Sequence, residues 1–332
     1  MNIKKIGLTA LAASLVSVSA NAGEMTVAGS ASMTVEGYTG ENRNSGTGFS
    51  MGNQLTFSGS GELDNGLTVS LSFVLDQGDD GNTNTASATN KIGGTAPFDG
   101  HSVTVSSDSL GTLVFAGEGG SSAATSIDGS AAGDIWDTFD GSRSSTVSGV
   151  AVKDSAPGDN SLFYTLPTVM DDLAVNLSYK PQGTGAESAT GYGLAYTGLE
   201  GLTAKYATTE INTGATGTSG DQVAWSLSYA YGPVTASASN SDYDVSTSTA
   251  DQELSSYAIS YTVSDEISVT YGTEDIAKGG STTDAEFSSI SASYTAGGMT
   301  ITAAMKEGEN INHGTSSTQD FDYWSLGASF AF

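Results

Sequence analysis

Residues 223–238 read VAWSLSYAYGPVTASA, and this stretch decides the expected fold. Apolar side chains occupy every second position on both sides of a Gly-Pro pair: Val223, Trp225, Leu227, Tyr229 and Tyr231 before it, and Val234, Ala236 and Ala238 after it. A period of two is that of a β-strand with one apolar face. The Gly-Pro pair interrupts the alternation as a turn does. The stretch therefore predicts two antiparallel strands joined by a short turn.

The same alternation recurs along the whole chain from residue 25 onward. We count sixteen such segments, joined by seven short connections that alternate strictly with eight long ones. Serine, threonine and glycine dominate the other face, and aromatic residues gather near the short turns, as at a membrane interface. A closed antiparallel sheet leaves no edge that lipid would have to hydrogen-bond. The pattern predicts an all-β fold, a 16-stranded antiparallel transmembrane β-barrel with both termini on the short-turn side.

The first 22 residues have the features of a secretory signal peptide. Two lysines precede an apolar stretch that ends at Ala20-Asn21-Ala22, an A-x-A cleavage site. The alternative, a membrane anchor, needs a longer apolar run than residues 6–19 provide. We therefore expect residues 1–22 to be removed and residues 23–332 to form a single barrel domain in the outer membrane.

Composition excludes several classes of protein. Ten Lys and Arg against 37 Asp and Glu give a formal net charge of −27, which excludes a nucleic-acid binder that neutralises phosphates. The absence of cysteine excludes a disulfide scaffold, a thiol nucleophile and a thiolate metal site. No GxSxG, HExxH or Walker motif is present. We therefore expect no enzyme, and no cofactor is required.

Several stretches resemble the general, non-specific porins of Gram-negative outer membranes, most of all the alphaproteobacterial type. Residues 111–117 (GTLVFAG) are similar to that family's strand before its third loop, and residues 160–167 (NSLFYTLP) to the strand after it. Phe332 resembles the family's terminal aromatic residue, which implies recognition by the barrel-assembly machinery. The resemblance implies a homotrimer of barrels, each narrowed by a third loop folded inward.

The longest connection, residues 119–160, holds the position of that loop. Its acidic residues, together with the residue that ends the preceding strand, are the candidate constriction: Glu118, Asp128, Asp134, Asp137 and Asp140. Apolar residues between the acids could anchor the loop to the inner wall, whereas an acidic external loop is the alternative. Carboxylates in a narrow passage favour cations over anions. Because calcium prefers oxygen ligands, it is a possible guest at Asp134, Asp137 and Asp140.

One feature departs from the family. Its members tend to carry arginines on the wall that faces the loop, but here Gly117 is followed by Glu118, which strict alternation would point into the lumen. Lys180, Lys205 and Lys306 have lumen parity on other strands and could supply a weak basic face, or they could be solvated lysines at the rim. This imbalance predicts selectivity for cations.

The sequence leaves three functions open. The first is a water-filled channel through which small hydrophilic solutes and cations diffuse passively. The second is a substrate-specific porin, which would need aromatic residues or paired charges in the lumen. The third is a structural or adhesive barrel without conductance, which would need a filled lumen. The expected partners are outer-membrane lipids, further copies of the chain and the assembly machinery.

Overall fold

A computed structural model describes residues 25–39, 46–76, 100–127, 130–139, 152–153, 155, 160–181, 188–212, 219–246, 249, 251–316 and 319–332. The predicted signal peptide and Asp128 and Asp140 therefore lie outside the described residues. The five-residue 3-10 helix η1 (Ile135–Phe139) lies in this part of the chain, and no helix in the described residues is long and apolar enough to cross a membrane.

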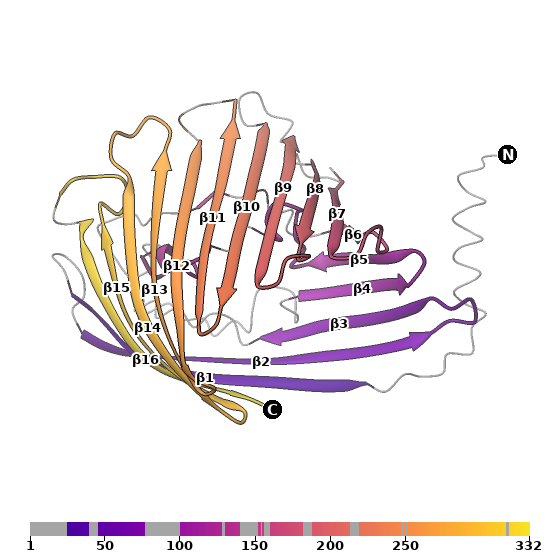
Figure 1. The fold of residues 1–332 in the computed structure, drawn as a ribbon, viewed down its shortest axis with the longest axis horizontal. Coiled ribbons are helices and arrows are strands. Elements are labelled where there is room, and N and C mark those ends of the chain that lie inside the picture. Colours follow the sequence, from indigo (N-terminus) through magenta and orange to yellow (C-terminus); the bar gives the residue numbers. More distant parts are fainter. Residues whose placement is uncertain are drawn as a thin grey trace, which may run out of the picture.

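Sixteen antiparallel strands form one closed barrel, as the alternation predicted (Figure 1). In chain order they are β1 (Thr26–Thr39), β2 (Gly46–Glu62), β3 (Thr68–Asp76), β4 (Gly100–Ser107), β5 (Gly111–Glu118), β6 (Ser161–Thr165), β7 (Leu173–Lys180), β8 (Ser188–Tyr196), β9 (Leu202–Asn212), β10 (Gly220–Tyr231), β11 (Val234–Val245), β12 (Gln252–Ser264), β13 (Ile267–Lys278), β14 (Ala285–Ala296), β15 (Met299–Glu309) and β16 (Phe321–Ala331).

Pairing between the first and last strands closes the barrel. The register runs from Ser30 opposite Ala331 to Thr39 opposite Asp322. Beyond the last strand, Gly29 and Phe332 exchange two backbone hydrogen bonds, with N···O distances of 2.7 and 2.9 Å. The terminal residue thus seals the seam with its backbone, while its side chain is 75% exposed on the outside. Its role in recognition by the assembly machinery stays a prediction.

The two faces of the sheet differ in chemistry. Side chains that point outward along the middle of the strands are large, apolar and exposed, for example Tyr229, Ile259 and Leu326. Side chains on the inner face of β1 to β3 are mostly small and hydroxylated, and cross-strand pairs such as Ser58–Ser72 and Ser60–Ser70 lie side by side. This arrangement suits a barrel with lipid outside and water inside.

The strands extend further toward the long connections than the alternation indicated. The pattern ended β13 near Tyr271 and started β14 near Ile290, yet the strands reach Lys278 and start at Ala285. In these extensions the inner face is apolar and the outer face is polar: Ile276 is buried inside the barrel, whereas its neighbour Asp275 points outward. Outward apolar residues therefore mark only part of β13 and β14.

Candidate functional site

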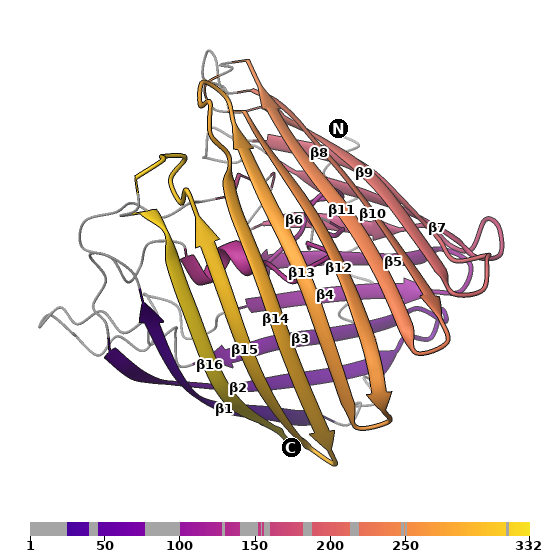
Figure 2. The ribbon, with the colours of Figure 1, turned by 60° about the vertical axis from the view of Figure 1, so that its left-hand side comes forward.

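The described residues of the third loop, 119–127, 130–139, 152–153, 155 and 160, include segments that lie against the inner wall of the barrel. Figure 2 shows η1, which belongs to this loop, inside the barrel behind β13 to β16. The loop leaves β5 and first contacts the inner wall at β7 and β9. There the backbone N–H of Ala123 donates to Ser178 Oγ (2.8 Å), and that of Ala124 donates to Thr209 Oγ1 (3.1 Å). Both wall residues point inward and are almost fully buried.

The same kind of contact repeats further around the wall. The N–H of Ala131 donates to Ser239 Oγ on β11, and the N–H of Ala132 donates to Ser256 Oγ on β12, both over 2.8 Å. Backbone N–H groups buried without a partner are costly, so a loop pressed against a wall needs acceptors at fixed positions. Inward side chains on β7, β9, β11, β12 and β13 supply them, four through a hydroxyl and one through a carboxylate. We call this row of acceptors, Ser178, Thr209, Ser239, Ser256 and Glu274, the wall ladder.

Glu274 on β13 is the charged member of the wall ladder. Its side chain is 0% exposed, and its carboxylate accepts hydrogen bonds from Ser130 Oγ and from the N–H of Trp136 (3.0 Å). The N–H of Ile135 also donates to it. These two N–H groups belong to the first turn of η1, where no carbonyl of the helix can serve them. Glu274 therefore caps the helix from the barrel wall.

The far end of η1 is held by two side chains from the wall. Lys306 Nζ on β15 donates to Thr138 Oγ1 over 2.6 Å, and the Tyr38 hydroxyl on β1 donates to the Thr138 carbonyl over 3.0 Å. Lys306 also interacts electrostatically with Glu274, Asp137 and Asp134. The loop thus spans the interior from β7 to β1.

Two glutamines hold the returning part of the loop. Gln222 on β10 is 0% exposed, and its Oε1 accepts from Ser155 N (2.7 Å) and Ser155 Oγ (2.5 Å). Gln252 on β12 accepts from the N–H of Lys153 over 2.6 Å. Lys153 and Ser155 are thus held at two different points of the wall, on β12 and on β10.

A glycine on the wall lets the loop approach closely. Gly272 points inward on β13, and a Cβ built there would lie 2.6 Å from Ala132 Cβ. Contacts of this length do not occur between side chains, so a larger residue would push the loop away from the wall.

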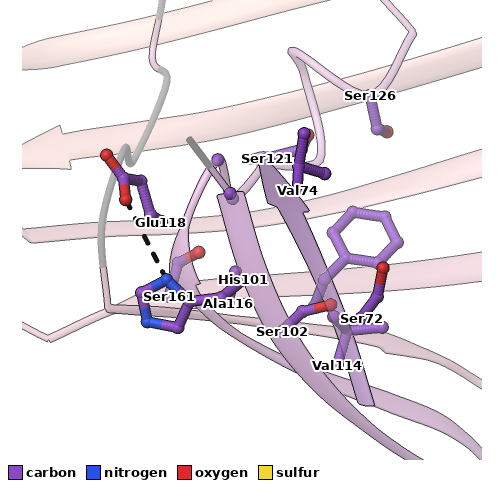
Figure 3. Close-up of a pocket in the computed structure, with 14 residues that line it drawn as sticks. Ser72, Val74, His101, Ser102, Val114, Ala116, Glu118, Ser121, Ser126 and Ser161 are labelled. Carbon is purple, nitrogen blue, oxygen red and sulfur yellow. Dashed lines mark ion pairs between the residues drawn. The ribbon is translucent and has the colours of Figure 1, made fainter. Parts of the chain in front are cut away.

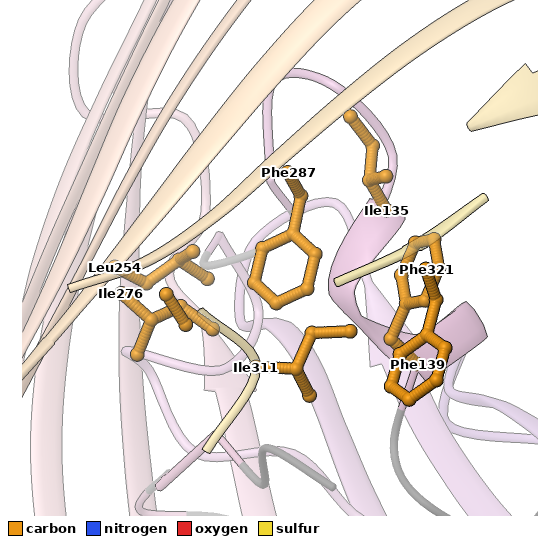
Figure 4. Close-up of a cluster of buried hydrophobic side chains, with 8 residues drawn as sticks. Ile135, Phe139, Leu254, Ile276, Phe287, Ile311 and Phe321 are labelled. Carbon is orange, nitrogen blue, oxygen red and sulfur yellow. The ribbon is translucent and has the colours of Figure 1, made fainter. Parts of the chain in front are cut away.

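An apolar cluster buries one side of η1 inside the barrel. Its buried members come from the loop, from the ends of β12, β13, β14 and β16, and from the connection before β16: Ile135, Phe139, Leu254, Ile276, Ala285, Phe287, Ile311 and Phe321 (Figure 4). The rings of Phe139 and Phe287 stack with centroids 5.6 Å apart. Each fully buried side chain of this size contributes about 1.5–3 kcal/mol. The apolar residues that the sequence suggested as anchors, Ile135 and Phe139 above all, do anchor the loop.

The side chains that hold the described residues of the third loop lie on β1, β7, β9 to β13 and β15. The inner face of β2 to β4 is a different part of the wall. That face carries hydroxyl and amide side chains such as Gln54, Thr56 and Thr104. Asp134 and Asp137 on the docked loop share the barrel interior with these hydroxyl and amide side chains.

Two of the predicted constriction acids can be located on the docked loop. Asp134 directly precedes η1 and Asp137 lies within it, and both side chains are exposed while their neighbours Ile135 and Phe139 are buried. No group of three or more His, Cys, Asp or Glu residues in the described ranges could hold a metal ion. Because Asp140 falls outside them, the calcium site at Asp134, Asp137 and Asp140 stays a prediction.

Glu118 lies directly after an irregularity in the strand pairing, and its place in the constriction stays a prediction. A register shift between β4 and β5 leaves Gly117 without a paired residue on β4 and sets Glu118 opposite His101. The Glu118 carboxylate and the His101 imidazole lie 3.9 Å apart. A β-bulge of this kind interrupts the alternation of faces on which the lumen assignment rested. The glycine is required there, because the His101 ring occupies the space that a side chain at Gly117 would need.

The three predicted lysines differ in their surroundings. Lys306 faces the lumen, but its ammonium is bound to the loop. Lys205 lies on β9 between Ala195 and Ser226, and Lys180 lies on β7 opposite Ala189; both are partly exposed and have the inward parity. None of the three lies on β1 to β5. Among the described residues, that wall therefore lacks the basic side chains that the family resemblance implies.

The sequence reading missed Glu274, Gln222 and Gln252. Residues 274–284 and 240–252 were interpreted as long connections, so a charged or amide side chain there was not considered part of the wall. Their inward parity was the available signal: Glu274 continues the series Ser268, Thr270 and Gly272.

Comparison with known proteins agrees with this geometry. A family model described as a Gram-negative porin matches residues 7–332. The chain belongs to the Gram-negative porin family. It is therefore an outer-membrane protein that forms a porin channel. No curated protein sequence matches it.

Solved porins share the fold at low sequence identity. One porin structure superimposes with a TM-score of 0.66 at 18% identity, covering 93% of this chain and 100% of that one. An anion-selective porin from Comamonas acidovorans gives 0.65 at 14% identity, covering 93% and 99%. A loop-deletion mutant of OmpT, an outer membrane protein of Vibrio cholerae, gives 0.62 at 14%, covering 94% and 100%. Since one of these porins is anion-selective, the shared fold does not by itself determine ion selectivity, which depends on the side chains.

Proposed function

We propose that this porin forms a water-filled, cation-selective channel for the passive diffusion of small hydrophilic solutes and ions. The observation that supports it most directly is the position of Asp134 and Asp137, two exposed carboxylates on a loop fastened inside the barrel. Their possible counter-charge, Lys306, is bound to Thr138 and lies among carboxylates. An excess of negative charge in a narrow passage raises the local concentration of cations and repels anions.

Planar-bilayer recording in a potassium chloride gradient tests the proposal. The reversal potential should have the sign of a channel that prefers potassium over chloride. The double variant D134N/D137N should shift it toward zero, and D171N/D172N, which removes two exposed acids in a short turn, should leave it unchanged. A reversal potential of the anion-selective sign would refute the acidic constriction. Absence of conductance would favour the structural or adhesive barrel.

Homotrimeric assembly is a second part of the proposal. It rests on the family resemblance, and native mass spectrometry of the detergent-extracted protein tests it: a monomer as the only species would refute it. Membership of a channel family supports a transport role over catalysis.

A further inference from the structure

A recess lies in the inner wall where the third loop begins. It has a volume of about 380 Å³ and lies against β3 to β6 and the first residues of the loop (Figure 3). Binding pockets for small molecules have volumes of this order. The recess is separate from Asp134 and Asp137, neither of which lines it.

The floor of the recess is apolar and includes an aromatic ring. Val114 and Phe163 are cross-strand partners on β5 and β6, and Val74 lies on β3, which β4 separates from β5. Phe163 alternates with Leu162 and Tyr164, which have the outward parity, so it points into the lumen. An apolar surface inside a water-filled barrel gains free energy when a solute covers it.

Hydroxyl groups surround this floor: those of Ser72, Ser102, Ser121, Ser126 and Ser161. A hydroxyl both donates and accepts hydrogen bonds, so it can serve a partner hydroxyl in either direction. Ser72 and Ser102 are direct cross-strand partners, which fixes their spacing. The Ser126 hydroxyl donates a hydrogen bond to the Ala123 carbonyl over 2.7 Å, so its oxygen can still accept a hydrogen bond from a solute.

The charged groups of the recess are paired with each other. Glu118 and His101 lie 3.9 Å apart, and Figure 3 shows this pair at one edge of the lining, away from Ser72 and Val114. A solute over the apolar floor therefore meets hydroxyl groups and no isolated charge. This chemistry favours a neutral solute over an ion.

We propose that this recess is a binding subsite of the pore for a neutral, polyhydroxylated ring of monosaccharide size. The carbon–hydrogen face of the ring covers Phe163 and Val114, while its hydroxyls exchange hydrogen bonds with Ser72 and Ser102. The inference rests on the proposed diffusion channel and deepens it, because the pore would bind one class of solute weakly during passage.

Single-channel recording with glucose in the bath tests the subsite. Glucose should add concentration-dependent current noise to the open channel, whereas sorbitol, which is a linear polyol, should add less because it has no ring face. F163A and S102V should each reduce the glucose effect at least several-fold. S329V, on the inner face of β16 and outside the recess, is the matched control and should retain it.

The outcomes separate this inference from the proposed function. Potassium conductance without any glucose effect, or a glucose effect unchanged in F163A and S102V, would overturn the subsite and leave the channel intact. Equal noise from glucose and sorbitol would also overturn it. If either variant fails to assemble, F163L, which keeps apolar volume but removes the ring, provides the same comparison.

Discussion

Replacing Glu274 with alanine should loosen the third loop. The change removes the acceptor of three hydrogen bonds and leaves the N–H groups of Ile135 and Trp136 buried without partners. A hydrogen bond to a charged group contributes about 1.5–3 kcal/mol, and a stranded buried donor costs about 1–3 kcal/mol. Because these terms overlap, we expect the docked state to lose about 3–6 kcal/mol in total.

A loss of this size lowers the ratio of docked to undocked loop by a factor of about 10² to 10⁴. The measurement is single-channel conductance in planar bilayers. E274A should show a noisier open channel with additional conductance levels, and E274Q, which keeps one acceptor oxygen, should show a smaller change. D275A, the next residue on the outer face, is the matched control and should behave as the wild type.

Barrel integrity is checked separately by heat-modifiable migration in gels. If E274A assembles and its conductance, noise and ion preference equal those of D275A, then Glu274 does not hold the loop and the capping argument is wrong.

Three further perturbations have defined outcomes. Gly272→Val should displace the loop, because a side chain there meets Ala132, and it should raise open-channel noise; G272A should do so less, and quiet currents in both would contradict the close approach. Lys306→Met removes a cation from the lumen, so the reversal potential should shift further toward potassium preference; a shift toward chloride would oppose this assignment. Burial lowers the pKa of His313, in the connection before β16, below its ordinary value of 6.5. The proton therefore binds more readily when this connection is undocked, and its docking weakens as the pH falls below 6.5. Hydrogen exchange in residues 310–316 should accelerate below that pH in the wild type, where His313 Nδ1 lies 3.2 Å from the Thr283 carbonyl, and should not do so in H313Q.

The membrane determines which parts of the fold can be predicted from the sequence. Lipid requires outward side chains without charge at every second position, so the central part of each strand is visible in the sequence, as in residues 223–231. Outside the lipid layer, outward side chains no longer need to be uncharged. At Asp275 and Ile276 the polar residue points out and the apolar residue points in, and the same alternation with reversed faces was interpreted as a connection.

The candidate site was predictable only in part. The loop, its acids and its apolar anchors are contiguous in the chain, so the sequence could predict a loop at residues 119–160 with anchors for the inner wall. The partners of the loop are not contiguous. Ser178, Ser239 and Glu274 lie on three different strands and become neighbours of one loop only because the barrel closes.

Sequence by itself determined the number of strands, their antiparallel order, the side of the short turns and the excess of acid, since each of these depends on local alternation and composition. Only the tertiary structure decided which wall the third loop contacts, which side chains hold it, and that a bulge at Gly117 sets Glu118 beside His101. The physical reason is the range of the interactions. Strand periodicity is set by neighbours two residues apart, whereas loop docking joins residues far apart in the chain, from 55 positions for Ala123 and Ser178 to 108 for Ala131 and Ser239.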